Sequence, residues 1–163
     1  MKQILSFTLL LLCFFGALAQ EQMLSPKATA KGNDIEITYG QPSKRGRVIF
    51  GELVPYGEIW RAGANEATEI TFKKSMTFAG KQVKAGTYTL FTIPREKEWK
   101  IILNGKLGQW GAYDYDKYKS LNVLEATVPV YHTDAVADKL TYTVTEKGVT
   151  IEWDKTGVLI PVK

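Results

Sequence analysis

The sequence predicts an all-β protein with a single domain. Apolar and polar residues alternate over many short segments, and glycine, proline and asparagine separate these segments. Outside the N-terminal segment, no stretch repeats its apolar residues with the 3.6-residue period of a helix. We therefore expect about nine antiparallel strands, arranged as a β-sandwich or a barrel-like fold.

The chain begins with a segment that is typical of export. Lys2 precedes an apolar run over residues 4–18 that ends in small side chains, which predicts a signal peptide at residues 1–19 and cleavage before Gln20. The run is shorter than the ~20 apolar residues of a membrane span, so we expect a signal peptide and not an anchor. No second apolar run follows it, so no membrane span is expected in the mature chain. The protein is predicted to be periplasmic or secreted. Its one cysteine, Cys13, lies within the run, so the mature chain has no thiol.

The mature chain divides into a polar lead-in and one β domain. Residues 20–32 are expected to be flexible, and residues 33–163 to form the domain. Lys74 predicts a bend or an edge, Pro129 predicts a sheet edge or a strand end, and residues 133–138 are a candidate for one helical turn. The apolar patterns predict strands around residues 35–39, 48–50, 70–78, 88–93, 99–103, 124–130, 140–144, 149–153 and 158–162.

Two segments follow neither the strand nor the helix pattern. In residues 54–68, here the Trp-Arg segment, residues 60–66 hold an aromatic ring, a guanidinium, an amide and a carboxylate around small residues that allow close approach to the backbone. Residues 109–118, here the aromatic segment, carry four rings spaced by glycine and aspartate. We expect the two segments to lie side by side at one end or face of the sheet, with Arg61 paired to Glu66 or Asp114.

This composition favours a binding site. Aromatic faces stack on sugar rings or on the apolar parts of small ligands, while amide, guanidinium and carboxylate groups bind hydroxyls or charges. We predict an exported domain that binds a carbohydrate or another small polar ligand and uses no cofactor. The expected ligand-binding residues are Tyr56, Trp60, Arg61, Asn65, Glu66, Trp110, Tyr113, Asp114 and Tyr115.

Two alternatives stay open. A carboxylate-dependent, glycosidase-like hydrolase would use Glu66 and Asp114 as its catalytic residues, because glycoside cleavage needs two carboxyl groups about 5–10 Å apart. In the other alternative, the domain is a structural or interaction module of the cell envelope, and Arg61 and Glu66 serve only the fold.

Other functional classes lack the residues that they need. With His132 as the one histidine and no cysteine in the mature chain, no metal site is expected. A serine nucleophile on a Gly-x-Ser-x-Gly turn is not found. The formal net charge is only +4 and the basic residues are scattered among acids, which argues against nucleic-acid binding. The basic residues at 44–47 are interpreted as a solvated turn.

Several of these motifs resemble a known family. The Trp-Arg-x-Gly-Ala-Asn-Glu-Ala-Thr motif at residues 60–68 and the Trp-Gly-Ala-Tyr-Asp-Tyr run at residues 110–115 are similar to those of an exported bacterial family catalogued as a domain of unknown function. The resemblance extends over roughly residues 30–124. It implies export and a β-rich fold, and it supplies no reaction, substrate or catalytic residue.

Overall fold

Nine strands build the part of the protein that the structure describes, which confirms the all-β prediction. The computed structural model describes residues 25–163, so the expected signal peptide lies outside the described residues. The strands are β1 (Lys27–Lys31), β2 (Ile35–Gly40), β3 (Glu69–Phe72), β4 (Met76–Phe78), β5 (Lys81–Val83), β6 (Gly86–Pro94), β7 (Glu98–Asn104), β8 (Asn122–Thr145) and β9 (Gly148–Pro161). The helix α1 (Tyr115–Tyr118) and a 3₁₀ turn (Lys119–Leu121) precede β8. Within residues 25–163, no helix has the length and apolar character needed to cross a membrane.

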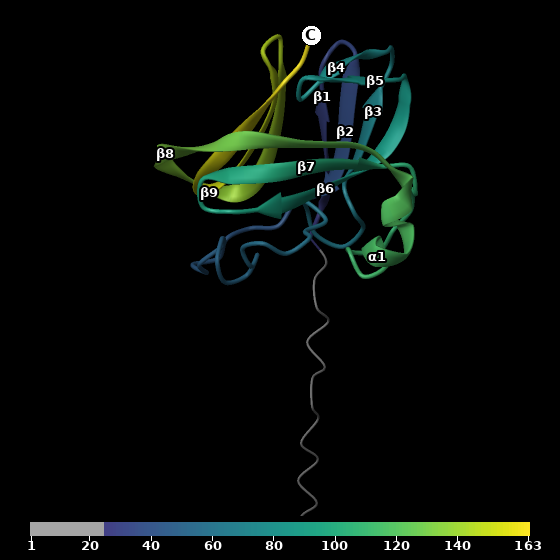
Figure 1. The fold of residues 1–163 in the computed structure, drawn as a ribbon. Helices are drawn as coiled ribbons and strands as arrows, with labels where there is room; N and C mark the ends of the chain where they lie inside the picture. The colour runs from purple at the N-terminus through teal and green to yellow at the C-terminus, as the bar shows by residue number, and fades with distance from the viewer. Residues whose placement is uncertain (1–24) are drawn as a thin grey trace, which may run out of the picture.

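Seven strands form one antiparallel sheet that curls on itself. Its order is β1-β2-β3-β6-β7-β8-β9, and β4 pairs with β5 in a separate small sheet. In Figure 1, β1 to β3 stand upright while β6 and β7 run across the molecule. Two hydrogen bonds close the curl. The Leu140 amide donates to the Pro42 carbonyl over 3.0 Å, and the Lys44 amide donates to the Asp138 carbonyl over 2.6 Å. These bonds join the segment after β2 to β8, so the sheet encloses a core.

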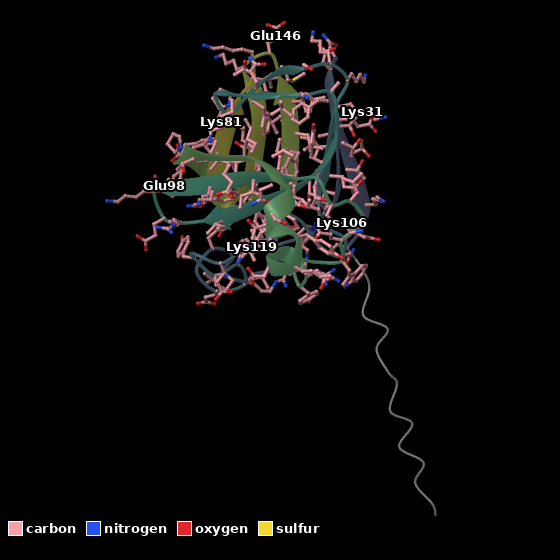
Figure 2. All side chains as sticks on the ribbon, turned by 45° about the vertical axis from the view of Figure 1, so that its right-hand side comes forward. Lys31, Lys81, Glu98, Lys106, Lys119 and Glu146 are labelled. Atoms are coloured by element: carbon pink, nitrogen blue, oxygen red, sulfur yellow. The ribbon has the colours of Figure 1, made fainter. Side chains whose placement is uncertain are left out.

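The core fills the inside of this curl. In β2 the side chains of Ile35, Ile37 and Tyr39 are buried, and Glu36 and Thr38 between them are only half-buried. This alternation is the one that the sequence predicts, and each buried apolar side chain contributes about 1.5–3 kcal/mol. Charged side chains surround the core on the outside, and Lys81, Glu98, Lys106, Lys119 and Glu146, which are labelled in Figure 2, are all exposed. The largest fully buried side chains include Trp99, Trp153, Phe72, Phe78 and Phe91.

β6 and β7 are buried on both faces, as the continuous apolar run of β6 predicts. Leu90 packs into the main core, whereas its neighbour Phe91 packs with Ala67 and Ile102 in a second, smaller cluster. Tyr115 lies against this second cluster. Ala67 belongs to the Trp-Arg segment and Tyr115 to the aromatic segment. The two irregular segments therefore cover the outer face of β6 and β7.

Residues 27–31, which were expected to belong to the flexible lead-in, form β1 instead. This strand lies at the edge of the sheet and pairs with β2 along its whole length. Only Ala28 and Ala30 pack against the core, while the residues around them are exposed. An edge strand with two small apolar side chains carries a weak alternation, so the pairing with β2 determines its conformation.

Two other strand predictions change in detail. Residues 48–50 do not form a strand and make only an isolated bridge between Phe50 and Val54. The expected strand at residues 70–78 is divided into β3 and β4 by a bend at Lys73 and Lys74. The bend predicted at Lys74 is thereby confirmed.

The helical turn expected at residues 133–138 is wrong. This stretch belongs to β8, which spans 24 residues and joins two strands that the sequence separates. Its backbone stays extended because it remains paired with β9, through His132 with Thr156 and Ala137 with Asp154, across two register shifts. Asp154 has a φ of 57° at this irregularity. Local polar residues here mark a bulge in a long hairpin rather than its end.

Pro129 lies where β8 changes its partner. Glu98 of β7 pairs with Pro129, and the next residue, Val130, pairs with Val158 of β9. A residue without an amide proton is tolerated at such a point because the pairing with β7 ends there. The predicted sheet edge or strand end is wrong, because β8 continues to Thr145 and lies between β7 and β9 in the sheet.

Candidate ligand-binding site

A cleft of about 1140 Å³ opens between the Trp-Arg segment, the aromatic segment and the loop at residues 42–47. Small-molecule sites in proteins commonly have volumes of about 300–1000 Å³, so this cleft can hold a small ligand. Residues from the loop, from both segments and from β9 meet here. The lining residues are Ser25, Pro42, Ser43, Arg45, Arg47, Leu53, Val54, Pro55, Glu58, Ile59, Trp60, Arg61, Gly63, Ala64, Asn65, Trp110, Tyr113 and Trp153.

The two irregular segments lie side by side, as predicted. Glu66 and Trp110 form an antiparallel bridge. On either side of this bridge, the amide of Ala67 donates to the carbonyl of Gln109 over 2.8 Å, and the amide of Gly111 donates to the carbonyl of Asn65 over 3.0 Å. Because the contacts are between backbones, the relative position of the two segments does not depend on their side chains.

The Trp-Arg segment is also fixed to the sheet. Trp60 and Thr92 of β6 exchange two backbone hydrogen bonds of 2.7 and 2.9 Å, and the amide of Ala64 donates to the carbonyl of Gly40 over 3.1 Å. At Gly40 an added Cβ would overlap the Ala64 carbonyl, so the end of β2 must be glycine for this approach. The segment is therefore a rigid part of the site.

The Ala62 carbonyl ties the segment to the core. It accepts hydrogen bonds from Thr68 Oγ1 at 2.9 Å and from the buried Tyr142 hydroxyl at 2.6 Å. Burial raises the pKa of Tyr142, so the hydroxyl keeps the proton that it donates. Ala62 has a φ of 54° and Asn65 a φ of 64°. Non-glycine residues in this region carry about 1–2 kcal/mol of strain, which the surrounding bonds maintain.

Tryptophan rings form the floor of the cleft. The rings of Trp60 and Trp153 stack with centroids 6.2 Å apart and planes 15° apart. Trp99 and Phe50 meet Trp60 edge-on, each at 6.0 Å. Trp60 and Trp153 line the cleft, whereas Trp99 is fully buried beneath them. The floor is thus continuous with the main core, and Trp60 serves the fold as well as the cleft.

Two exposed rings of the aromatic segment form a wall. Trp110 is 55% exposed and Tyr113 is 80% exposed, and both line the cleft. Gly111 between them has a φ of 67°, and a Cβ there would come within 2.7 Å of the Tyr113 ring and 3.4 Å of Arg61 Nη1. Glycine at this position allows Tyr113 and Arg61 to lie close to the same backbone.

The predicted pairing of Arg61 with Glu66 or Asp114 is wrong for the described residues. No ion pair joins the Arg61 guanidinium to another of residues 25–163, and its buried Nε has no hydrogen-bond partner among them. Glu66 and Asp114 are exposed instead. Asp114 starts α1, where its carbonyl accepts the amides of Lys117 and Tyr118. The Asp114 side chain is exposed at the start of α1 and does not line the cleft.

The remaining predicted site residues fall into two groups. Asn65 lines the cleft, and its Nδ2 donates to the Ser25 carbonyl over 2.9 Å. Tyr56 and Tyr115 do not line it. The Tyr115 ring packs edge-on against Phe91 with centroids 5.2 Å apart, in the second apolar cluster. Of the nine predicted residues, five line the cleft: Trp60, Arg61, Asn65, Trp110 and Tyr113.

Four charged or aromatic lining residues were not among the predicted ones: Arg45, Arg47, Glu58 and Trp153. The basic turn was interpreted as solvated, and Arg45 is indeed exposed. Arg47 is partly engaged, because its Nε donates to the Lys44 carbonyl over 3.0 Å and its Nη2 to the Ser43 carbonyl over 2.6 Å. The basic turn therefore borders the cleft. Its charges were visible in the sequence, but its position depends on the meeting of residues 41–44 with β8.

The cleft holds a single carboxylate side chain among the described residues. This is Glu58, whereas Glu66 and Asp114 lie outside it. No group of three or more histidine, aspartate or glutamate residues within residues 25–163 could hold a metal ion. His132 is exposed on β8, with Nδ1 3.3 Å from the Lys155 carbonyl oxygen. The charged groups of the cleft are thus mainly guanidinium groups.

Comparisons with known proteins place the chain in a family without assigning a reaction. No curated protein sequence and no solved structure is detectably similar to it. A family model described as "Protein of unknown function (DUF2911)" matches residues 21–162, which is nearly the whole chain. The chain therefore belongs to the DUF2911 family of proteins of unknown function.

Proposed function

We propose that the cleft binds a small polar ligand that contains a ring, and that a carbohydrate is the class that fits it best. The observation that carries the proposal is the exposure of Trp110 and Tyr113 beside a floor of tryptophan rings. Exposed aromatic rings that line one cleft offer faces on which the apolar face of a sugar ring can stack.

Polar groups around the rings support the same class of ligand. Asn65, Ser43 and Glu58 line the cleft and can donate or accept hydrogen bonds with hydroxyl groups. The backbone contacts that fix the Trp-Arg segment also support binding, because a preorganised site loses little conformational entropy when its ligand enters. Export of the protein, as the N-terminal segment predicts, would bring the cleft to the sugars of the cell envelope or of the surroundings.

The hydrolase alternative has less support. Glycoside cleavage needs two carboxyl groups across the substrate, and Glu58 is the carboxylate that the described residues contribute to the cleft. The proposed role is therefore binding, without a reaction.

Trp110 provides the test of this role. Three of the four tryptophans, Trp60, Trp110 and Trp153, line the cleft, so intrinsic fluorescence reports directly on its occupancy. Titration with a panel of mono- and oligosaccharides should change the emission of the wild-type protein. Trp110→Ala should weaken that binding at least ten-fold, or about 1.4 kcal/mol, because an exposed ring at the centre of a contact contributes strongly.

The control is Val136→Ala. Val136 is 53% exposed, close to the exposure of Trp110, and lies outside the cleft on β8. This variant should bind like the wild type. A saccharide that binds the Trp110→Ala protein with unchanged affinity would contradict the proposed site.

A further inference from the structure

Arg61 is a cation without a partner among the described residues of the cleft. Within residues 25–163, its buried Nε has no hydrogen-bond partner and its guanidinium forms no ion pair. The cation–π contacts of the described chain involve Lys106 and Lys117 with Tyr118, not Arg61. A partly buried guanidinium with a donor that lacks both water and an acceptor is unfavourable for folding.

The position of Arg61 explains why this arrangement is useful. The residue follows Trp60, whose backbone is bonded to β6, and precedes Ala62, whose carbonyl is held by Thr68 and Tyr142. Its side chain lines the cleft, and its Nη1 lies beside the glycine between Trp110 and Tyr113. A ligand stacked on the exposed rings would therefore lie next to the guanidinium.

The other charges of the cleft point to the same ligand chemistry. Three of the four arginines of the chain, Arg45, Arg47 and Arg61, line the cleft, whereas no lysine within residues 25–163 does. The planar guanidinium binds carboxylate and phosphate groups through two parallel hydrogen bonds, which an ammonium group cannot do. Against these three cations stands one carboxylate of the described residues, Glu58.

We propose that the ligand of the cleft carries an oxyanion, a carboxylate or a phosphate on its ring, and that Arg61 binds it. The proposal rests on the proposed function of the cleft, since it adds the charge of the ligand to its ring. Arg61 is the anchoring residue, and Arg45 at the exposed rim contributes electrostatic attraction.

The experiment compares acidic and neutral forms of one ring. The protein is produced from its full-length sequence, and its affinities for glucose, glucuronate and glucose 6-phosphate are measured by calorimetry at constant ionic strength. The variants are Arg61→Met, which keeps the aliphatic stem, Arg61→Lys, which keeps the charge, and Arg95→Met as control. Arg95 is exposed in the turn after β6 and lies outside the cleft.

We expect at least one acidic sugar to bind the wild type about ten-fold or more tightly than glucose, because hydrogen bonds between charged groups are about twice as strong as neutral ones. Whether glucuronate or glucose 6-phosphate is preferred distinguishes a carboxylate from a phosphate. Arg61→Met should abolish the preference, Arg61→Lys should retain only part of it, and Arg95→Met should retain all of it. Equal affinity of the wild type for acidic and neutral sugars, or a preference that persists in Arg61→Met, would overturn the proposal.

A second readout separates this proposal from the proposed function. Thermal unfolding is measured in inorganic phosphate and in potassium chloride at equal ionic strength. The rise in Tm that phosphate produces should be larger for the wild type and for Arg95→Met than for Arg61→Met. That result without any sugar binding would keep the anion site and reject the carbohydrate. Trp110-dependent binding of glucose and glucuronate with equal affinity would keep the proposed function and reject the anion site. No phosphate effect together with no sugar binding would reject both.

Discussion

The carbonyl oxygen of Ala62 connects the Trp-Arg segment, which lines the cleft, to the core. Tyr142 donates to it from β8, 80 positions away in the sequence, and Thr68 donates to it from the far end of the same loop. These two bonds hold the residue next to Arg61 at a φ of 54°. The strain at Ala62 is maintained by buried partners, which is common at ligand sites.

Removal of the Tyr142 hydroxyl tests this joint. Tyr142→Phe should lower the free energy of unfolding by about 1 kcal/mol, because a buried hydrogen bond is lost while the ring remains. Tyr88→Phe is the matched control, since the Tyr88 hydroxyl donates to the Lys84 carbonyl over 3.1 Å at an exposed position. Its effect should stay below about 0.5 kcal/mol. Urea unfolding measures both, and equal losses in the two variants would argue against a special role for the buried bond.

At the scale of elements, the Trp-Arg segment approaches the end of β2 closely enough to require a glycine there. Gly40 ends β2 and its carbonyl accepts the Ala64 amide, while its missing side chain leaves room for the Ala64 carbonyl. The same face of the segment meets β6 through Trp60 and Thr92. Two strands thus hold the loop that presents Arg61, and a Cβ added at Gly40 would disrupt the contact with β2.

Gly40→Ala should destabilise the protein by about 3 kcal/mol or more, since the added Cβ can be placed only if the backbone moves. Gly105→Ala serves as the control, because the nearest atom to a Cβ there is the Leu121 carbonyl oxygen at 3.6 Å. That variant should unfold close to the wild type. The comparison is made by urea unfolding with the emission of the cleft tryptophans recorded in parallel. Similar midpoints for the two variants would show that the approach is not tight.

Much of the element pattern follows from local sequence, and the exceptions have physical causes. Ile35, Ile37 and Tyr39 are buried alternately as their spacing predicts. The sequence does not predict β1, because an edge strand with two alanines gains its stability from pairing with β2. Residues 133–138 were misassigned because polar residues in a bulge resemble those of a turn. In both cases pairing with another strand decides the conformation.

The candidate site was predictable in part. The adjacency of the Trp-Arg and aromatic segments followed from their rings and charges, and it is confirmed by the backbone bridge between Glu66 and Trp110. The lack of an ion-pair partner for Arg61 among residues 25–163 was not predictable. Pairing depends on the directions of side chains, which cannot be deduced from the spacing of residues in the sequence. The stacking of Trp60 on Trp153 was equally hidden, since it joins two distant parts of the chain.

At the scale of the whole molecule, the curl of the sheet creates the cleft. Closure between residues 41–44 and β8 brings the basic turn beside the Trp-Arg segment, and β9 contributes Trp153 from the other end of the chain. The apolar core is complete inside the curl, and the second cluster lies outside β6 and β7. The molecule therefore combines a buried apolar interior with a cleft that is lined by the exposed rings of Trp110 and Tyr113 and by Arg61.

Export of the whole protein is a prediction from its N-terminal segment. We expect protein recovered outside the cytoplasm to begin at Gln20, because the small residues before it match a signal-peptidase site. Intact-mass spectrometry of such material measures the N-terminus directly. Retention of residues 1–19, or a lipid on Cys13, would show that the N-terminal segment has another role.

The cleft bounded by Arg61 and Trp110 is proposed to bind a ring-containing ligand. A crystal structure of the protein soaked with neutral and acidic saccharides tests it most directly. We expect electron density for a sugar ring stacked on Trp110 or Tyr113, with a carboxylate or phosphate within hydrogen-bond distance of the Arg61 guanidinium. A ligand bound elsewhere on the molecule, with the cleft holding solvent at saturating concentrations, would contradict it.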